Sequence, residues 1–215
     1  MANRGKSSSE IAETLRADIC LNRRVEDGML HEGALGQRFG VSRTPVRQAL
    51  QRLAYERMIT VKSGVGSVIS ALEENQRDDD TRAAVALLSA VASCAPRQSA
   101  TAAQVMDFAG MLGMLEVSDL TQAEDFFELR SRLLTALAAL IENPILEDAF
   151  RAAYWRLIRW RLRDLKADSA AQVALLDVLV RGIVQTLKDG TIAETFAEVA
   201  EIEGLQSNIH SANQK

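Results

Sequence analysis

The residues of this chain whose types and spacing best suit chemistry are polar side chains near the start of one predicted helix. They are Arg43, Thr44, Arg47 and Gln48. An arginine near the leading end of a helix can donate two parallel hydrogen bonds to a guanine edge or to a phosphate. This set therefore indicates a helix that reads base edges from within the major groove of DNA.

The neighbouring residues predict how that helix is positioned. Ser42 is a suitable N-cap, and Pro45 falls in the first turn, where a missing N–H does no harm. Apolar residues recur at helical spacing and predict the buried stripe: Val46, Ala49, Leu50 and Leu53. The pattern predicts a recognition helix that runs to about Arg57 and turns its polar residues outward. Ser42 is counted with the DNA-binding residues.

The sequence around the recognition helix predicts a small domain. Ser7 and Glu10 have the spacing of a capping box, and apolar residues after them predict a first helix. A short second helix follows His31 and ends at Gly40, because glycine suits a left-handed helix cap. Two β-branched runs flank a glycine-rich turn that contains Gly64, which is typical of a hairpin. Three helices and a hairpin predict a winged helix-turn-helix domain over residues 1–72.

Charge divides the chain into two parts. Residues 1–72 hold 11 Lys/Arg against 7 Asp/Glu, whereas residues 73–215 hold 14 against 22. A basic front joined to an acidic remainder indicates a DNA-facing module attached to a part that stays off DNA. The polar stretch 73–80 is expected to be a linker, or a linker whose C-terminal part already begins a helix. Residues 81–215 predict an all-helical bundle with helices at about 81–94, 100–115, 122–141, 145–166, 170–188 and 191–210, so the fold class is mainly α.

Several function classes are excluded by what the sequence lacks. The two histidines, His31 and His210, are far apart, so no Ser-His-Asp or Cys-His arrangement is indicated, and we expect no enzyme. Cys20 and Cys94 have no metal-binding or redox spacing. The sequence shows neither a signal-peptide core nor an apolar run long enough for a bilayer. We expect a cytoplasmic protein with no membrane partner and no cofactor.

The N-terminal module resembles the GntR family of bacterial transcription regulators. The resemblance rests on residues 40–50, GVSRTPVRQAL, on Leu30-His31-Glu32 and on the wing glycine Gly64. It implies that Arg43, Thr44 and Arg47 contact DNA and that Gly64 enters the minor groove. One departure is Gly33, since well-known members carry a DNA-contacting arginine just after the glutamate.

The C-terminal part resembles the all-helical effector domain of the FadR-type branch, also called FCD-like. The match rests on Asn143-Pro144-Ile145-Leu146 and on Asp189-Gly190. Many members of that branch bind a divalent metal through one aspartate and three histidines. Those positions fall near Arg130, Leu134, Leu179 and Glu201 or, after a small slip, Glu203. Because arginine stays protonated and has no lone pair to give, we expect the metal site to be absent.

Three charged residues share faces with apolar ones in the predicted helical part. Arg130 and Arg161 lie within apolar stripes, and Glu203 shares a face with Phe196 and Val199. A charge on a core face costs free energy unless it is paired. Arg130 and Arg161 either bind an anionic effector, or Arg130 pairs with Glu203 as a structural ion pair; a third possibility is an arginine that reaches the rim along its stem. The candidate effector-binding residues are Arg130, Arg161, Leu134, Leu179 and Glu203.

The long helix that contains Arg161 carries further arginines and aromatic residues. Arg156, Arg159 and Arg163 point away from Arg161, and we expect them on a solvated face. Trp155 and Trp160 lie off the main apolar stripe of that helix. They indicate a second packed face or a dimer contact.

These observations predict a sequence-specific DNA-binding transcription regulator, acting as a repressor and as a homodimer on a pseudo-palindromic operator. Its operator affinity is expected to respond to a small-molecule effector, such as an organic anion, in the helical domain. The alternative is an effector-independent dimeric DNA-binding protein whose helical domain is a ligand-free scaffold.

Overall fold

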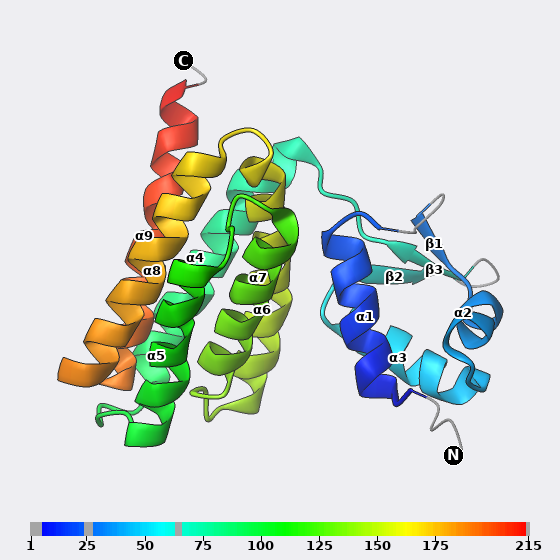
Figure 1. Cartoon of the computed structure of the whole chain (residues 1–215), viewed down its shortest axis with the longest axis horizontal. Helices are drawn as coiled ribbons and strands as arrows, with labels where there is room; N and C mark the ends of the chain where they lie inside the picture. Colours follow the sequence, from blue (N-terminus) through cyan, green and yellow to red (C-terminus); the bar gives the residue numbers. More distant parts are fainter. Residues whose placement is uncertain (1–5, 24–27, 63–65, 214–215) are drawn as a thin grey trace. The chain divides into compact units, whose positions relative to one another are not determined.

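The computed structural model describes residues 6–23, 28–62 and 66–213, with side chains as far as residue 205. The chain forms two compact units, residues 1–71 and residues 72–215 (Figure 1). The first contains three helices and a small antiparallel sheet, and the second is helical throughout its described residues. The predicted fold class, a winged helix-turn-helix followed by a helical bundle, is confirmed.

The first unit follows the predicted order of elements. Its helices are α1 (Ser8–Cys20), α2 (Glu32–Phe39) and α3 (Arg43–Tyr55), and its strands are β1 (Met29–Leu30), β2 (Ile59–Lys62) and β3 (Gly66–Ile69). The capping box of Ser7 and Glu10 starts α1 as expected. The hairpin pairs Ile59 with Ile69 and Lys62 with Gly66. Strand β1 was not predicted; it adds to β3 and gives the sheet order β1-β3-β2.

The core of this unit forms where α1 packs on α3. Leu15, Val46 and Leu53 have no exposed surface, so the apolar stripes expected on both helices do face one another. A buried ion pair reinforces this contact, because Arg16 Nε and Nη2 donate to both carboxylate oxygens of Glu56 at 2.7 Å. Paired in this bidentate way, two buried charges satisfy one another. The core therefore buries the apolar face of α3, and the opposite face of the helix points outward.

The second unit is a bundle of long helices. They are α4 (Arg77–Cys94), α5 (Ala102–Val117), α6 (Ala123–Ala138), α7 (Pro144–Leu165), α8 (Ser169–Asp189) and α9 (Ile192–Asn213), preceded by the short 3-10 helix η2 (Glu74–Gln76). Local signals set several starts: the Asn143 side chain caps α7 ahead of Pro144, and Asp168 caps α8. Apolar side chains from these helices fill the interior, among them Leu88, Phe126, Leu133, Phe150, Ile158, Leu176, Ile183 and Phe196.

Residues 73–80 are mostly helical, because η2 precedes Arg77 and α4 begins there; a helix start in the C-terminal part of the predicted linker is confirmed, whereas η2 was not predicted. Three aspartates, residues 78–80, lie in the first turn of α4, where negative charge complements the helix dipole. Asp80 also accepts a hydrogen bond from Trp160 Nε1 at 2.8 Å and pairs with Arg156 at 2.5 Å. The ion pair and hydrogen bond with α7 therefore stabilise helical structure in a segment that the sequence predicted to be solvent-exposed.

The expectation of a solvated basic face on α7 is correct only in part: Arg163 is exposed, but Arg156 is mostly covered and both arginines have partners. Arg163 pairs with Glu74 at 3.1 Å, and its Nη1 donates to the Leu72 carbonyl at 3.4 Å. The guanidinium groups of Arg163 and Arg77 lie over the Trp160 ring, and Arg77 also pairs with Asp164. Trp160 is buried against the first turn of α4. It therefore belongs to the second packed face that was expected for the two tryptophans.

Candidate DNA-recognition surface and buried charge cluster

A tight turn connects α2 to α3 and sets where the recognition helix begins. Gly40 adopts a left-handed conformation, with φ 66° and ψ 34°, which glycine tolerates without strain. Gly36 lies against the turn: its carbonyl accepts from Val41 N at 3.0 Å, and a Cβ at this position would come within 3.1 Å of the Val41 oxygen. The two glycines allow α2 and α3 to join through a three-residue connection, Gly40, Val41 and Ser42.

The leading turns of α3 present polar side chains to the outside. Arg43, Thr44, Arg47 and Gln48 are all exposed, whereas Val46 and Ala49 on the other side of the helix are buried. The first turn of α3 holds no acidic residue, so nothing within it offsets the positive end of the helix dipole. The exposed side of α3 therefore combines guanidinium, hydroxyl and amide groups with a helix end that attracts phosphate.

Arg47 is held in place by a carboxylate from α2. Its Nε and Nη2 donate to the two carboxylate oxygens of Glu32, both at 2.8 Å, while the Arg47 side chain keeps 61% of its surface exposed. The hydrogen bonds from Arg47 lower the pKa of Glu32, and Arg43 adds attraction. The free domain thus orients Arg47, and a phosphate or base that engages the same edge must compete with Glu32.

Two further DNA-binding predictions have different outcomes. Ser42 occupies the N-cap position of α3 with extended backbone, but its side chain makes no capping hydrogen bond among the described residues. Gly64 follows β2 and precedes β3 in the sequence and lies outside the described residues, so its predicted DNA contact stays a prediction. The neighbouring Gly66 has φ 127°, a conformation that side chains rarely adopt, so the turn ends on a position that requires glycine.

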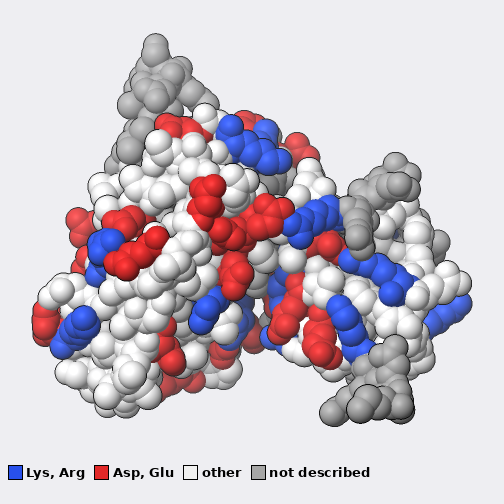
Figure 2. Space-filling model, viewed as in Figure 1, with Lys and Arg blue, Asp and Glu red and all other residues white. Residues whose placement is uncertain are grey.

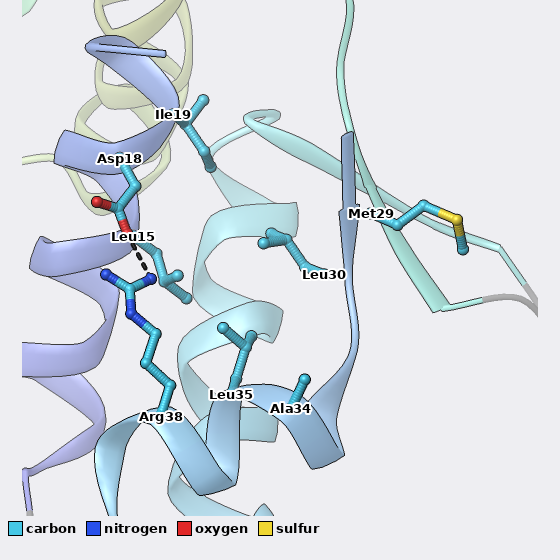
Figure 3. A pocket seen from close by; sticks show the side chains of 8 residues that line it. All are labelled: Leu15, Asp18, Ile19, Met29, Leu30, Ala34, Leu35 and Arg38. Atoms are coloured by element: carbon cyan, nitrogen blue, oxygen red, sulfur yellow. Dashed lines mark ion pairs between the residues drawn. The ribbon is translucent and has the colours of Figure 1, made fainter. Parts of the chain in front are cut away.

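A hollow of about 250 Å³ lies between α1, α2 and β1 (Figure 3). Its wall is apolar except for one ion pair, in which Arg38 of α2 reaches Asp18 of α1 at 2.5 Å. The other lining residues are Leu15, Ile19, Met29, Leu30, Ala34 and Leu35. The pair ties α2 to α1 and so helps to fix the turn that presents α3.

In the helical unit, four residues from three helices form a buried charge cluster: Arg130 of α6, Tyr154 and Arg161 of α7, and Glu203 of α9. Glu203 Oε1 accepts from Arg130 Nη1 at 2.5 Å and from the Tyr154 hydroxyl at 3.1 Å. Glu203 Oε2 accepts from Arg161 Nη2 at 2.9 Å and from its Nε at 3.2 Å. All four residues are buried, and Arg130 and Glu203 have no exposed surface.

The cluster carries one more positive charge than negative. Burial would raise the pKa of Glu203, but attraction from Arg130 and Arg161 outweighs burial and lowers it to about 2, so the carboxylate is ionised at neutral pH. Burial also lowers the pKa of Arg161 below its ordinary value. Arg130 Nε and Nη2 are buried without a hydrogen-bond partner among the described residues. A buried guanidinium with three of its five N–H donors unsatisfied is costly, and an acceptor at that edge would relieve the cost.

The structure brings together three of the five candidate effector residues. Arg130, Arg161 and Glu203 are in contact, and neither arginine reaches the rim, so the third possibility was wrong. Leu134 and Leu179 are fully buried core residues of α6 and α8 and bring no polar group. Tyr154 was not among the predicted site residues, because a tyrosine on an apolar stripe is usually a core residue. Its position two turns before Arg161 on the same stripe was the signal.

The donor set at this place does not fit the divalent metal that the family resemblance implies. The expected ligand positions hold a protonated arginine and two leucines, which have no lone pair to offer, and the one carboxylate is bound by two arginines. Within residues 6–23, 28–62 and 66–205, no group of three or more histidine, cysteine, aspartate or glutamate side chains is placed to hold a metal ion. No chemistry is therefore assigned to a metal here.

Surface charge differs between the two units. Figure 2 shows acidic side chains gathered on the visible face of the helical unit, whereas basic ones are more prominent on that of the first unit. Phosphate contacts supply most of the affinity of a DNA-binding domain, and they require such basic groups. The distribution fits an N-terminal unit that faces DNA.

Comparison with known proteins identifies the first unit. Residues 7–69 match the family model described as bacterial regulatory proteins, gntR family. The E. coli protein McbR/YncC has a similar structure, with a TM-score of 0.62 and 21% sequence identity over 97% of this chain and 98% of that one. A transcriptional regulator GntR from Rhodococcus sp. RHA1 matches with a TM-score of 0.58 and 16% identity over 96% of both chains. The curated proteins include no significant match.

At these identities the solved structures establish a shared fold, and the family model establishes the kind of DNA-binding domain. The matched residues contain the whole of α1, α2, α3 and the β2–β3 hairpin. Residues 7–69 therefore belong to the GntR family of bacterial regulatory proteins, and they fold as its winged helix-turn-helix domain.

Proposed function

We propose that the chain represses transcription as a homodimer and that a small organic anion, bound at the buried charge cluster of the helical unit, sets its affinity for the operator. The observation that carries the proposal is Arg130, whose Nε and Nη2 lack a partner among the described residues although they are fully buried. Arg47 holds the Glu32 carboxylate through the same two nitrogens, so this edge is well suited to a bidentate carboxylate.

On the DNA side, two copies would place their α3 helices in successive major grooves of a pseudo-palindrome. Arg43, Thr44, Arg47 and Gln48 would contact base edges and phosphates, and Gly64 of the wing would approach the minor groove, as the family resemblance implies. The exposure of the four α3 side chains supports this role. We assign them base choice and register, and assign most of the affinity to phosphate contacts.

The burial of the cluster also supports a switch. Because Arg130 and Glu203 have no exposed surface, an anion reaches them only if helices of the bundle move. A ligand that binds one arrangement of the helices better than another shifts the balance between them, and a ligand without that preference shifts nothing. Binding at this place is thereby linked to a change in the helical unit.

One observation favours the alternative, an effector-independent regulator with a ligand-free scaffold. The pair of Arg130 and Glu203, at 2.5 Å, ties α6 to α9 and is the structural ion pair that the sequence also allowed. In that case the unsatisfied nitrogens of Arg130 meet water or remain a local cost of folding.

The two functions are separated by a ligand screen on full-length protein and its R130M variant. The R130M variant is expected to fold, because Glu203 keeps Arg161 as its partner and the cluster becomes neutral. Thermal unfolding is followed with a panel of monocarboxylates and with the neutral amide of each. R82M is the matched control, since it removes an exposed arginine from the same unit.

The proposal expects at least one carboxylate to stabilise the wild type and R82M and to change operator affinity in both, while its amide does neither. R130M should retain operator binding and lose the response. A carboxylate that acts equally on R130M would exclude Arg130 as the binding group. No response to any compound of the panel would favour the scaffold.

A further inference from the structure

The hollow between α1, α2 and β1 is larger than the gaps that a small protein core normally leaves. Its volume is about 250 Å³, whereas protein interiors contain few voids that exceed one water molecule. Four of the residues that line it belong to the core and have at most 6% of their surface exposed: Leu15, Ile19, Leu30 and Leu35. Apolar side chains that face a void lose contacts with neighbouring atoms, so a ligand that filled the hollow would restore them.

The same hollow is lined by a buried carboxylate (Figure 3). Asp18 of α1 keeps only 9% of its side-chain surface exposed, and Arg38 Nη1 lies 2.5 Å from its Oδ2. Despite this short distance, Oδ2 accepts no well-aligned hydrogen bond from the described residues. A buried carboxylate oxygen without such a donor is costly, so an N–H group that reached it would be stabilising.

Arg38 of α2 brings the opposite charge to the hollow. Its side chain is 29% exposed, and its guanidinium lies over the Phe39 ring, 4.8 Å from the centroid. Among the described residues Asp18 is its one charged partner, through Nη1, so Nε and Nη2 remain able to donate to an anion. Arg38 and the neighbouring lining residue Ala34 are both exposed, so the hollow is open to solvent on the α2 side.

We propose that this hollow binds an aliphatic α-amino acid. The ammonium group of the ligand donates to Asp18, its carboxylate accepts from Arg38, and its branched side chain contacts the apolar residues. A zwitterion satisfies both charges at once. A simple carboxylate would instead lie beside Asp18, and a simple amine beside Arg38, and like charges placed together oppose binding.

The volume of the hollow selects small members of this class. At about 30 Å³ for each water-sized group, 250 Å³ holds about eight non-hydrogen atoms. Valine, leucine and isoleucine are about this size, whereas tryptophan is roughly twice as large. The branched aliphatic side chains that line the hollow also favour an aliphatic ligand over a polar one.

The position of the hollow links it to the DNA-recognition surface. The pair of Asp18 and Arg38 joins α1 to α2, and a ligand that enters between the two charges replaces this direct contact. Helix α2 also carries Glu32, which accepts two hydrogen bonds from Arg47 of α3. The ligand therefore acts on the helix that orients Arg47.

The test is isothermal titration calorimetry of the full chain with L-leucine, L-isoleucine and L-valine. We expect at least one of them to bind with a Kd below about 1 mM. Two truncated forms of leucine separate the charges, since isopentylamine lacks the carboxylate and 4-methylpentanoate lacks the ammonium group. Each should bind at least about 10-fold more weakly, because each loses one charge-assisted hydrogen bond. L-tryptophan should not bind.

Three variants locate the site. R38M and D18N each remove one charge and should weaken amino-acid binding roughly 10-fold or more. A34L keeps both charges, extends a lining residue of α2 into the hollow and should abolish binding; the domain should still fold, because leucine is a good helix former. The matched control is Q37L, which places the same side chain on an exposed residue of α2 that does not line the hollow.

Binding that Q37L retains and A34L loses would support the site. The proposal would be overturned if none of the three amino acids bound, if the truncated forms bound as well as leucine, or if A34L and Q37L bound equally. All titrations are repeated with R130M, and amino-acid binding that R130M abolished would also overturn the proposal, since it would place the ligand at the buried charge cluster. The inference does not rest on the proposed effector site, so a failed carboxylate screen there leaves it unaffected.

Discussion

Replacing Glu203 by glutamine tests the buried charge cluster most directly. The side chains have nearly the same volume, so E203Q removes the negative charge without opening a cavity. Arg130 would then be buried with no opposing carboxylate, and Arg161 would keep only its weaker attraction to Asp164, since Glu203 is the shared partner of the two groups. Removing one member of a buried ion pair typically destabilises a protein by about 3–5 kcal/mol, because the remaining charge is uncompensated.

The magnitude can also be estimated from the carboxylate itself. The two arginines lower the pKa of Glu203 from 4.5 to about 2, although burial acts in the opposite direction. A shift of this size corresponds to about 3 kcal/mol in favour of the ionised form over the neutral one. Both arguments give about 3 kcal/mol, which for a unit of this size lowers the melting temperature by about 10 °C.

Tryptophan fluorescence provides a selective assay for this change. The chain has two tryptophans, Trp155 and Trp160, and both lie on α7 in the helical unit, so their emission reports the unfolding of that unit alone. The matched control is D177N, which breaks an exposed ion pair on α8. Exposed pairs contribute little, so we expect a change below about 2 °C. If the melting temperature of E203Q lies within about 2 °C of that of D177N, the buried charge cluster does not stabilise the bundle by about 3 kcal/mol.

Three further outcomes are expected. R47A should weaken binding to a selected operator roughly 10- to 100-fold and relax the choice of one base, measured by anisotropy with single-base variants; an equal loss on random DNA would assign Arg47 to phosphate alone. G33R should strengthen binding and steepen its salt dependence by about one counterion, because it adds a cation at the start of α2, where a Cβ would lie 3.9 Å from Arg43 Nη2; an unchanged slope would contradict this. Finally, the stabilisation from ionised Glu203, fully present above pH 4.5, should be lost as the pH falls toward 2, and E203Q should lack that component of the pH dependence of melting.

Local signals made much of the secondary structure predictable from the sequence. The residues Asn143-Pro144 set the start of α7, and Thr101 with Gln104 forms a capping box that starts α5. Gly40 ends α2 in the conformation that the sequence indicated. Each of these signals acts within four residues, so it can be read without knowledge of the fold.

What the sequence did not predict depends on contacts between distant segments. Strand β1 has two residues and carries no pattern of its own; it forms because β3 offers a free edge. The early start of α4 depends on Trp160 and Arg156, about 80 residues further along the chain. The role of Tyr154 depends on α9, which places Glu203 within hydrogen-bonding distance of the tyrosine hydroxyl. A helical wheel shows which face is apolar, but it does not show which helix faces it.

The placement of arginines around α7 gives that helix two attachments at once. On its inner side Arg161 pairs with Glu203, while two residues further along Arg163 pairs with Glu74 and donates to the carbonyl of Leu72, the first residue of the helical unit. Because α7 is one continuous helix, it cannot rotate or shift at one of these contacts without moving the other. A displacement of α7 beside Arg161 would therefore also move Leu72, because the same helix makes both contacts.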